Sequence, residues 1–332
     1  MHSPTLALGK DAPSSATPSR TARLALKAAL SGALLVFVVS RAQVADVRLP
    51  GGVAILGGMG AAVLLFAGAL VMSAVRWWLV LGPGLVPLGW LVRLYFIGQF
   101  FSLFLPTSVG GDAVRIVALS RGGVTTGRAL SSVIIERMLG VGALLLYLVL
   151  GGLMAPALVS PLLQRLSWAL GWRPALVLVI TGGLALGLLA MRVKRWVRFN
   201  QLLHDAGGVW ERLRVSRLPV ATAVCASLIV QAMYVLMWYL LAVSLDLGVP
   251  FRALLVFVPF VSLAAMLPVT ISGLGVREGV WTLLLQPLGI SSAHAIGFSL
   301  LFYVANLITG ALGGAIYMAR GAGAARVVSH VA

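Results

Sequence analysis

Long apolar runs recur along most of this sequence and limit the folds that it can adopt. The runs from about Gly52 to Val75 and from about Ala129 to Met154 are two examples. A helix needs about 20 such residues to cross the hydrocarbon core of a bilayer. Charged residues make up 10% of the 332 residues, against about a quarter in a soluble domain. The sequence therefore excludes a soluble enzyme, a disordered chain and a secreted scaffold, and predicts an all-α polytopic membrane protein.

The runs predict about six full spans and two broken pieces. The spans are expected up to about Ser40 and at about 52–75, 129–154, 175–191, 220–243 and 293–318. Proline and glycine interrupt the stretches 85–120 and 251–290, which we interpret as re-entrant helical hairpins; two full crossings are the alternative for 85–120. Residues 193–218 mix basic and apolar side chains, which predicts a segment on the membrane surface. Residues 1–20 and 321–332 read as tails.

Positive charge greatly exceeds negative charge, with 25 Lys and Arg against 8 Asp and Glu. In a soluble chain this excess would suggest binding to nucleic acid, but in a membrane protein basic residues mark the cytoplasmic side. Clusters at Arg20–Lys27 and 192–198 therefore orient the spans. We expect both termini in the cytoplasm and no nucleic-acid partner. Arg76, followed by Trp77 and Trp78, is interpreted as an anchor at the membrane interface.

Two stretches of the chain show the same order of landmarks. Pro106 and Arg115 in the first correspond to Pro268 and Arg277 in the second, each at a shift of 162 residues. The shared order predicts an internal duplication, with the copies at residues 21–158 and 159–320.

The orientation of the spans predicts that the two copies are inverted. Both ends of hairpin 85–120 are then on the cytoplasmic side, and both ends of hairpin 251–290 are outside. Inverted repeats whose broken helices meet near the midplane are an architecture of transporters. Irregular backbone at that depth is tolerated when it is buried in protein or lines a wet cavity.

Three of the eight acids are expected at membrane depth, where a charge costs a few kcal/mol or more. These are Asp112, Glu136 and Glu278, and an arginine lies near each one in the sequence, namely Arg115, Arg137 and Arg277. The favoured interpretation is a substrate or ion site. The alternative is that the charges form structural ion pairs that lock the hairpins, and for Asp112 a further alternative is a helix N-cap. These roles can coexist.

The hairpin tips combine residues suited to an anion. Proline ends the entering helix because it lacks a backbone N–H, and glycine permits the turn. The returning helix then points its N-terminal N–H groups and positive dipole end into the protein. The first tip contains Pro106, Thr107, Ser108, Gly110 and Gly111, and the second contains Pro268, Thr270, Ser272, Gly273 and Gly275. Together with Arg115 and Arg277, the tips predict a phosphate-sized anion site.

Other polar residues and glycines in the apolar runs have simpler interpretations. Arg93 is expected to extend to the membrane surface. Gln231, Tyr303 and Asn306 are read as polar contacts between helices, and Gly310, Gly313 and Gly314 as a helix-packing surface.

No pattern for a cofactor or a metal occurs in the sequence. A Walker motif is absent, and the four histidines are scattered. The single cysteine, Cys225, cannot form an intrachain disulfide. We therefore predict no cofactor, no metal and no enzyme activity.

The combined motifs resemble the transmembrane, flippase-like family of lysylphosphatidylglycerol synthases over about residues 25–320. The matching residues are Arg76-Trp77-Trp78, Pro106-Thr107-Ser108-Val109-Gly110-Gly111-Asp112-x-x-Arg115, Ser131-Ser132-Val133-Ile134-Ile135-Glu136-Arg137 and Ser272-Gly273-Leu274-Gly275-Val276-Arg277-Glu278-Gly279. Larger members fuse this membrane part to a soluble aminoacyl transferase. No such segment is present in this sequence, so we expect a stand-alone member and do not carry over the synthase activity.

Together with the residues, the resemblance implies a lipid flippase or scramblase in a bacterial inner membrane, with a membrane lipid as substrate. Its anionic or zwitterionic phosphate headgroup would bind between the two tips. Two alternatives stay open: a secondary transporter of a small soluble anion, and a non-transporting partner of a separate lipid-modifying transferase. The sequence leaves both a monomer and a homo-oligomer open.

Overall fold

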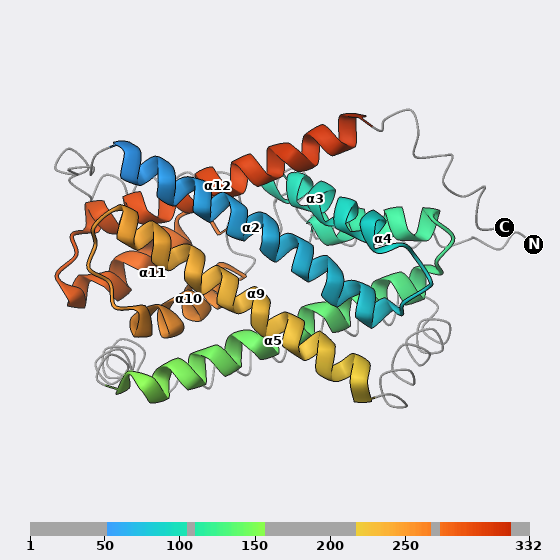
Figure 1. Cartoon of the computed structure of the whole chain (residues 1–332), viewed down its shortest axis with the longest axis horizontal. Helices are drawn as coiled ribbons and strands as arrows, with labels where there is room; N and C mark the ends of the chain where they lie inside the picture. The colour runs from blue at the N-terminus through green and yellow to red at the C-terminus, as the bar shows by residue number, and fades with distance from the viewer. Residues whose placement is uncertain (1–51, 105–109, 157–216, 267–272, 320–332) are drawn as a thin grey trace, which may run out of the picture.

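The computed structural model describes residues 52–104, 110–156, 217–266 and 273–319, and these residues form helices without a strand. The α-helices are α2 (Gly52–Leu81), α3 (Leu88–Phe104), α4 (Gly110–Arg121), α5 (Thr126–Met154), α9 (Arg217–Ser244), α10 (Phe251–Ala265), α11 (Val276–Leu285) and α12 (Ser292–Ala319), and a 3-10 turn η2 (Gln286–Leu288) follows α11 (Figure 1). Helices α2, α5, α9 and α12 are apolar and long enough to cross a membrane. The expected all-helical, multi-pass membrane character is thereby confirmed.

Several predicted segments lie outside the described residues. They are the span that ends near Ser40, the span at 175–191, residues 193–216 of the predicted surface segment 193–218, and the tails 1–20 and 321–332; residues 217 and 218 begin α9. The total number of spans therefore stays a prediction.

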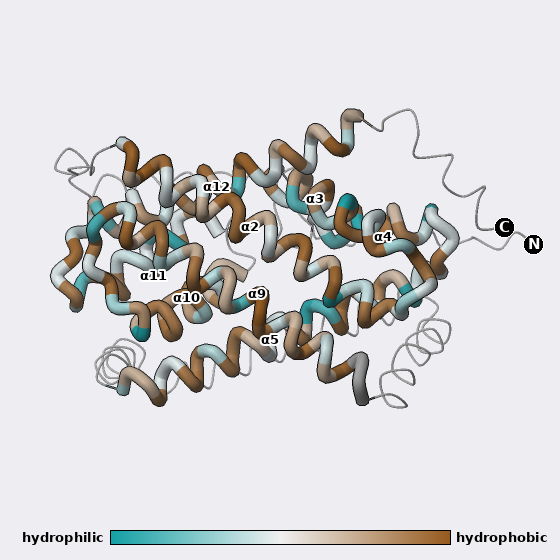
Figure 2. The backbone as a smooth tube through the Cα atoms, viewed as in Figure 1, coloured by the Kyte–Doolittle hydropathy of each residue, from teal (hydrophilic) through white to brown (hydrophobic). Residues whose placement is uncertain are grey.

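Hydrophobic residues recur along the full length of the long helices (Figure 2). Many of these side chains lie on the outside, such as Leu64 of α2 and Leu153 of α5. This distribution suits lipid contact, because apolar side chains around the whole circumference are typical of membrane spans. Helix α10 continues through Pro259, which is buried; the expected break at this proline is therefore wrong.

Helices α2 and α9 pack against each other in antiparallel directions. A Cβ added at Gly58 would overlap Ser244, and one added at Gly68 would meet Met233. Nearer the end of α2, Arg76 donates a hydrogen bond to Ser227. Residue numbers therefore rise along one helix as they fall along the other. Two small residues at this interface let the helices approach closely.

Each of the two shorter apolar helices packs on a span from the other half of the chain. Helix α3 contacts α12, and a Cβ added at Gly313 of α12 would overlap the backbone carbonyl of Phe96. Helix α10 contacts α5, and a Cβ added at Gly151 of α5 would lie 2.7 Å from the backbone of Leu255. Glycine is required at both positions because backbone approaches backbone.

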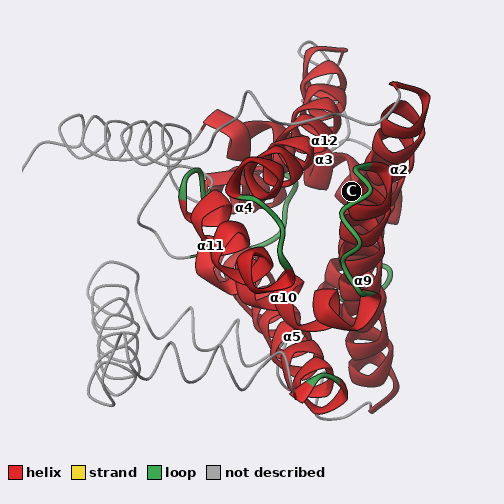
Figure 3. Ribbon diagram, turned by 90° about the vertical axis from the view of Figure 1, so that its left-hand side faces the viewer, coloured by secondary structure: helices red, strands yellow, loops and turns green. Residues whose placement is uncertain are grey.

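The contacts between helices follow the same pattern in the two halves of the chain. When each helix is replaced by the helix at the same position in the other half, one observed contact becomes another. Replacing α2, α3, α4 and α5 by α9, α10, α11 and α12 converts the α3–α12 contact into α10–α5, and the α4–α5 contact into α11–α12. The pair α2–α9 maps onto itself. Figure 3 looks along the long axis of the molecule and shows α2 beside α9, α3 beside α12, and α10 beside α5.

Two hydrophobic clusters lie toward opposite ends of the molecule. Each supports one pair of shorter helices: the first helical pair is α3–α4 and the second is α10–α11. One contains Trp77, Leu91 and Leu119 and supports α3 and α4. The other contains Trp238 and Trp281 and supports α10 and α11. In Figure 1, α3 and α4 lie in the right half and α10 and α11 in the left half.

Candidate functional site

A cavity of about 330 Å³ lies where the two halves meet. Each of the eight α-helices within the described residues contributes to its wall. Four arginines and two carboxylates line it, namely Arg76, Arg115, Arg137, Arg277, Asp112 and Glu136. Its formal charge is therefore positive, and polar side chains surround it in a molecule that is otherwise mostly apolar.

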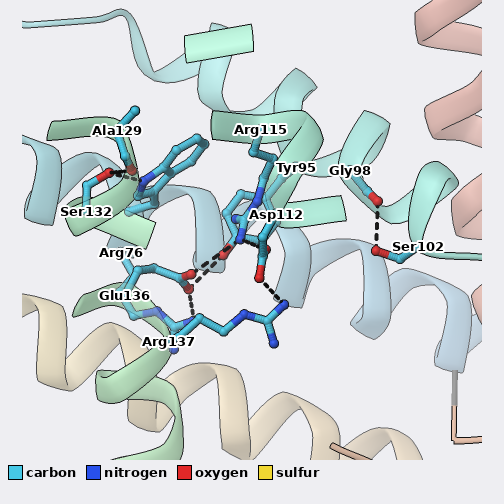
Figure 4. A network of polar contacts seen from close by, with 11 residues as sticks. Arg76, Tyr95, Gly98, Ser102, Asp112, Arg115, Ala129, Ser132, Glu136 and Arg137 are labelled. Carbon is cyan, nitrogen blue, oxygen red and sulfur yellow. Dashed lines mark hydrogen bonds and ion pairs between the residues drawn. The ribbon is translucent and has the colours of Figure 1, made fainter. Parts of the chain in front are cut away.

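Glu136 of α5 is the centre of a buried charge network (Figure 4). Its Oε1 forms an ion pair with Arg76 of α2 and accepts a 2.7 Å hydrogen bond from the hydroxyl of Tyr95 of α3. Its Oε2 lies 3.6 Å from Nη2 of Arg115 of α4. Glu136 is 2% exposed, so this carboxylate joins four helices with almost no access to solvent.

Asp112 of α4 is the second acid in the network. It pairs with Arg115 one turn further along the same helix, as the spacing of three residues predicts. Its Oδ2 also lies 2.5 Å from Nη2 of Arg137, whose side chain is 37% exposed and forms the rim of the network. Asp112 lies in the first turn of α4, after the start at Gly110. It therefore acts as an ion-pair partner, and not as the N-cap.

The helices place these charges through their buried faces. On α4, Asp112, Arg115 and Leu119 are buried at intervals of three and four residues, which puts them on one face. The Arg115 guanidinium lies over the rings of Tyr95 and Trp77, with its Cζ 4.1 Å and 4.9 Å from the ring centroids. These contacts are cation–π interactions, which add to the ion pairs that fix the arginine.

The second helical pair presents Arg277 differently. Its Cζ lies 4.2 Å from the ring centroid of Phe302 and 4.9 Å from that of Tyr303. Its Nη1 is buried without a hydrogen-bond partner among the described residues, and no described carboxylate pairs with it. Gly273 and Gly275 precede α11 with φ of 75° and 81°, a backbone conformation that glycine adopts without strain. This turn brings Arg277 to the cavity wall.

Glu278 does not pair with its neighbour Arg277, and the expectation of such a pair is wrong. Its carboxylate accepts a 2.6 Å hydrogen bond from the backbone N–H of Gly275 and a 3.0 Å bond from the Ser299 hydroxyl. The first of these bonds closes a capping interaction at the start of α11. Glu278 is completely buried and does not line the cavity.

Tyr234 of α9 connects the two charged groups across the cavity. Its phenol interacts electrostatically with Arg76, Arg137 and Arg277. Arg115 of the first helical pair and Arg277 of the second both line this cavity.

The structure brings together most of the described residues that the sequence singled out. Arg115, Asp112, Glu136, Arg137 and Arg277 line the cavity, as does Gly111. Glu136 and Arg137 pair with other residues than each other. Arg93 is exposed, and its extension to the membrane surface stays a prediction. The predicted tip residues Pro106, Thr107, Ser108, Pro268, Thr270 and Ser272 lie outside the described residues.

The interpretation of Arg76, Trp77 and Trp78 as an anchor at the membrane interface is wrong. Arg76 is 6% exposed and binds Glu136, and Trp77 is completely buried with its indole N–H 3.0 Å from Ser132 Oγ. The apolar residues that follow carry α2 on to Leu81. That continuation was the signal in the sequence that Arg76 lies within the helix and not at its end.

Tyr95 and Gln99 of α3 were also not predicted as site residues. Gln99 donates a hydrogen bond to Asn306 of α12, and both line the cavity. Asn306 thus makes the expected contact between helices and also contributes to the wall. The described residues contain no group of three or more His, Cys, Asp or Glu side chains placed to hold a metal ion.

Comparison with protein families gives a match over most of the chain. The family model for the lysylphosphatidylglycerol synthase TM region matches residues 24–314. A search of curated proteins finds no match. The matched region includes every described residue of the cavity wall.

Proposed function

Because this chain belongs to the family of lysylphosphatidylglycerol synthase transmembrane regions, we propose that it is a lipid flippase or scramblase. The observation that carries the proposal is the positively charged cavity between two helical pairs in a multi-pass membrane protein. The proposed cargo is the phosphate-bearing headgroup of a membrane lipid. The proposed location is the inner membrane of a bacterium, with both termini in the cytoplasm.

The proposed architecture is an inverted repeat of two spans, a re-entrant hairpin and a further span. The exchange of packing pairs between the halves supports a duplication. The antiparallel packing of α2 and α9 supports an inversion, since corresponding helices then run in opposite directions. In this arrangement α3–α4 enters from one side of the membrane and α10–α11 from the other, and their tips meet near the midplane.

In the proposed mechanism the phosphate lies between the two tips, with Arg115 on one side and Arg277 on the other. Both arginines line the same cavity, and guanidinium groups bind phosphate through paired N–H groups. The acyl chains stay in the lipid and reach the site through a lateral opening. Access alternates between the two hairpins, and one headgroup crosses while the hydrocarbon tails remain outside the protein.

The acids are proposed to hold the arginines in place when the site is empty. Asp112 and Glu136 contact Arg115, Arg137 and Arg76, which offsets the cost of several like charges at membrane depth. We propose no chemical reaction and no enzyme activity for the cavity. The proposal concerns headgroup binding and assigns no proton transport to the acids.

The test is reconstitution of the purified full chain in liposomes that contain fluorescently labelled phosphatidylglycerol. The expected result is that wild-type protein moves the lipid between leaflets and that Arg115→Ala moves it more slowly. Arg93→Ala is the matched control, because Arg93 is exposed and does not line the cavity. Equal rates for wild type and Arg115→Ala would contradict the site assignment.

The same liposomes separate the two alternative functions. A transporter of a small soluble anion would take up labelled phosphate and leave the lipid in its leaflet. A partner that presents lipid to a separate transferase would move neither probe. Either outcome would replace the flippase proposal.

A further inference from the structure

Both carboxylates on the cavity wall are already occupied by the protein's own cations. Glu136 contacts Arg76 and Arg115 and accepts a hydrogen bond from the Tyr95 hydroxyl. Asp112 contacts Arg115 and Arg137. An ammonium group that entered the cavity would find no free carboxylate there, and it would have to displace an arginine to gain one.

The aromatic faces beside the charges are occupied as well. An ammonium group can bind over an aromatic ring, but Arg115 already lies over Tyr95 and Trp77. Arg277 lies over Phe302 and Tyr303 in the same way. Four of the rings beside the charges therefore already hold guanidinium groups, while Phe66 and Tyr234 also line the cavity.

Nη1 of Arg277, in contrast, remains available to a ligand. Stacking uses the face of the guanidinium and leaves the donors at its edge free. Its Nη1 has no partner among the described residues. Nη1 of Arg115 and Nε of Arg76 are also buried without a partner in this part of the chain. Buried donors of this kind carry a desolvation cost until an acceptor reaches them.

We infer that the cavity selects a phosphate group without an accompanying ammonium group, and that Arg277 is the residue that binds this phosphate. This inference rests on the proposed function and narrows its substrate class to headgroups of net negative charge. The wall supplies four arginines against two carboxylates, so a phosphate lowers the net charge and an ammonium group raises it. At moderate distance in a poorly screened site, like-charge contacts cost several kcal/mol.

The size of the cavity agrees with a small headgroup. Its volume of about 330 Å³ is near the lower end of the range for small-molecule sites, about 300–1,000 Å³. One phosphate with a short polar substituent fits this volume, whereas a long oligosaccharide does not.

The first experiment measures binding of short-chain lipids to the purified full chain in detergent. The probes are dihexanoyl phosphatidylglycerol, dihexanoyl phosphatidylcholine and an aminoacylated dihexanoyl phosphatidylglycerol that carries ammonium groups. We expect phosphatidylglycerol to bind at least about tenfold more tightly than the aminoacylated lipid, because the added ammonium groups meet a wall of net positive charge. Equal or tighter binding of the aminoacylated lipid would overturn the inference.

Variants of Arg277 test the assignment of the phosphate ligand. Arg277→Gln is expected to weaken phosphatidylglycerol binding at least about tenfold, and Arg277→Lys, which keeps the charge, to weaken it less. Arg93→Gln is the control outside the cavity and should bind as the wild type does. The unfolding temperature of each variant reports whether it is folded, and the Lys variant provides the test if the Gln variant is not. Unchanged binding by a folded Gln variant would refute the role of Arg277.

Glycerol phosphate and inorganic phosphate identify the source of the bound group. Binding of phosphatidylglycerol well above both supports a lipid headgroup, and equal binding of all three would overturn the lipid assignment in favour of a soluble phosphate.

Liposome transport separates this inference from the proposed function. Movement of the aminoacylated lipid at the rate of phosphatidylglycerol would overturn the selectivity and leave the flippase proposal standing. Selective binding without movement of any lipid would support the selectivity and overturn the flippase.

Discussion

The two arginines that face each other across the cavity have opposite surroundings. Arg115 pairs with Asp112, lies near Glu136 and is 3% exposed. Arg277 occupies the matching place in the second half, yet aromatic rings hold it and no described carboxylate pairs with it. Arg115 is therefore part of a buried ion-pair network, whereas Arg277 is held by aromatic rings alone among the described contacts.

The acids near the two arginines differ in the same sense. Glu136 joins α2, α3, α4 and α5 through cations and a phenol. Glu278 serves its own helix start and one hydroxyl of α12. Two halves with matching helix packing therefore differ in the use of a buried acid, which serves ion pairs in one half and backbone capping in the other.

The largest effect is expected from Glu136→Gln, which removes the charge that Arg76 and Arg115 share. Loss of one partner of a buried ion pair costs about 3–5 kcal/mol, because the remaining charge stays buried. The free energy of unfolding, measured by denaturant titration of the protein in micelles, should fall by this amount. Asp246→Asn is the control, because Asp246 is an exposed acid. A loss no greater than in this control would show that the first network does not hold the fold.

A smaller loss in the free energy of unfolding, about 1–3 kcal/mol from overpacking, is expected in both halves when the helix-packing glycines are replaced by alanine. Gly313→Ala should separate α3 from α12, and Gly151→Ala should separate α5 from α10. Gly297→Ala and Gly142→Ala are controls on the same two helices, because a Cβ at either position has nothing within 4 Å. Measured by unfolding in micelles, a loss confined to one half would contradict the matched packing of the two copies.

Glu278→Gln is expected to cost about 1–2 kcal/mol, clearly less than the same change at Glu136. The amide oxygen can still accept one of the two hydrogen bonds made by Gly275 and Ser299, so one bond is lost. Unfolding of the two variants side by side gives the comparison. A cost equal to that of Glu136→Gln would mean that Glu278 has a charged partner and that the two acids have similar roles.

Much of the helical framework was predictable from the sequence. Apolar runs predict α5, α9 and α12 within three residues at each end, because a membrane leaves few alternatives to a helix, whereas α2 continues six residues beyond the predicted Val75. The repeated landmarks also placed Arg115 and Arg277 at equivalent positions before any contact was known. Small residues such as Gly313 indicated close packing, but they did not identify the partner helix, since contact between distant segments has no local signal.

The pairing of charges was the part that the sequence could not supply. Adjacent acids and arginines suggested that Glu136 pairs with Arg137 and Glu278 with Arg277, but neighbouring residues on a helix point in different directions. Glu136 instead pairs with Arg76, which is 60 residues earlier in the chain. Tyr95 was also missed, because a single tyrosine in an apolar helix gives no indication of its role.

The most direct test of the central claim is to measure lipid movement and unfolding together for Arg277→Gln. The arginine stacks on aromatic rings without a described ion pair, so its removal should lower the free energy of unfolding by about 2 kcal/mol, the value for a desolvated cation–π contact. We predict that movement of labelled phosphatidylglycerol in liposomes falls at least about tenfold, while Arg93→Gln moves lipid at the wild-type rate. Movement of the lipid by Arg277→Gln at the wild-type rate would contradict a transport site built between the two hairpin tips.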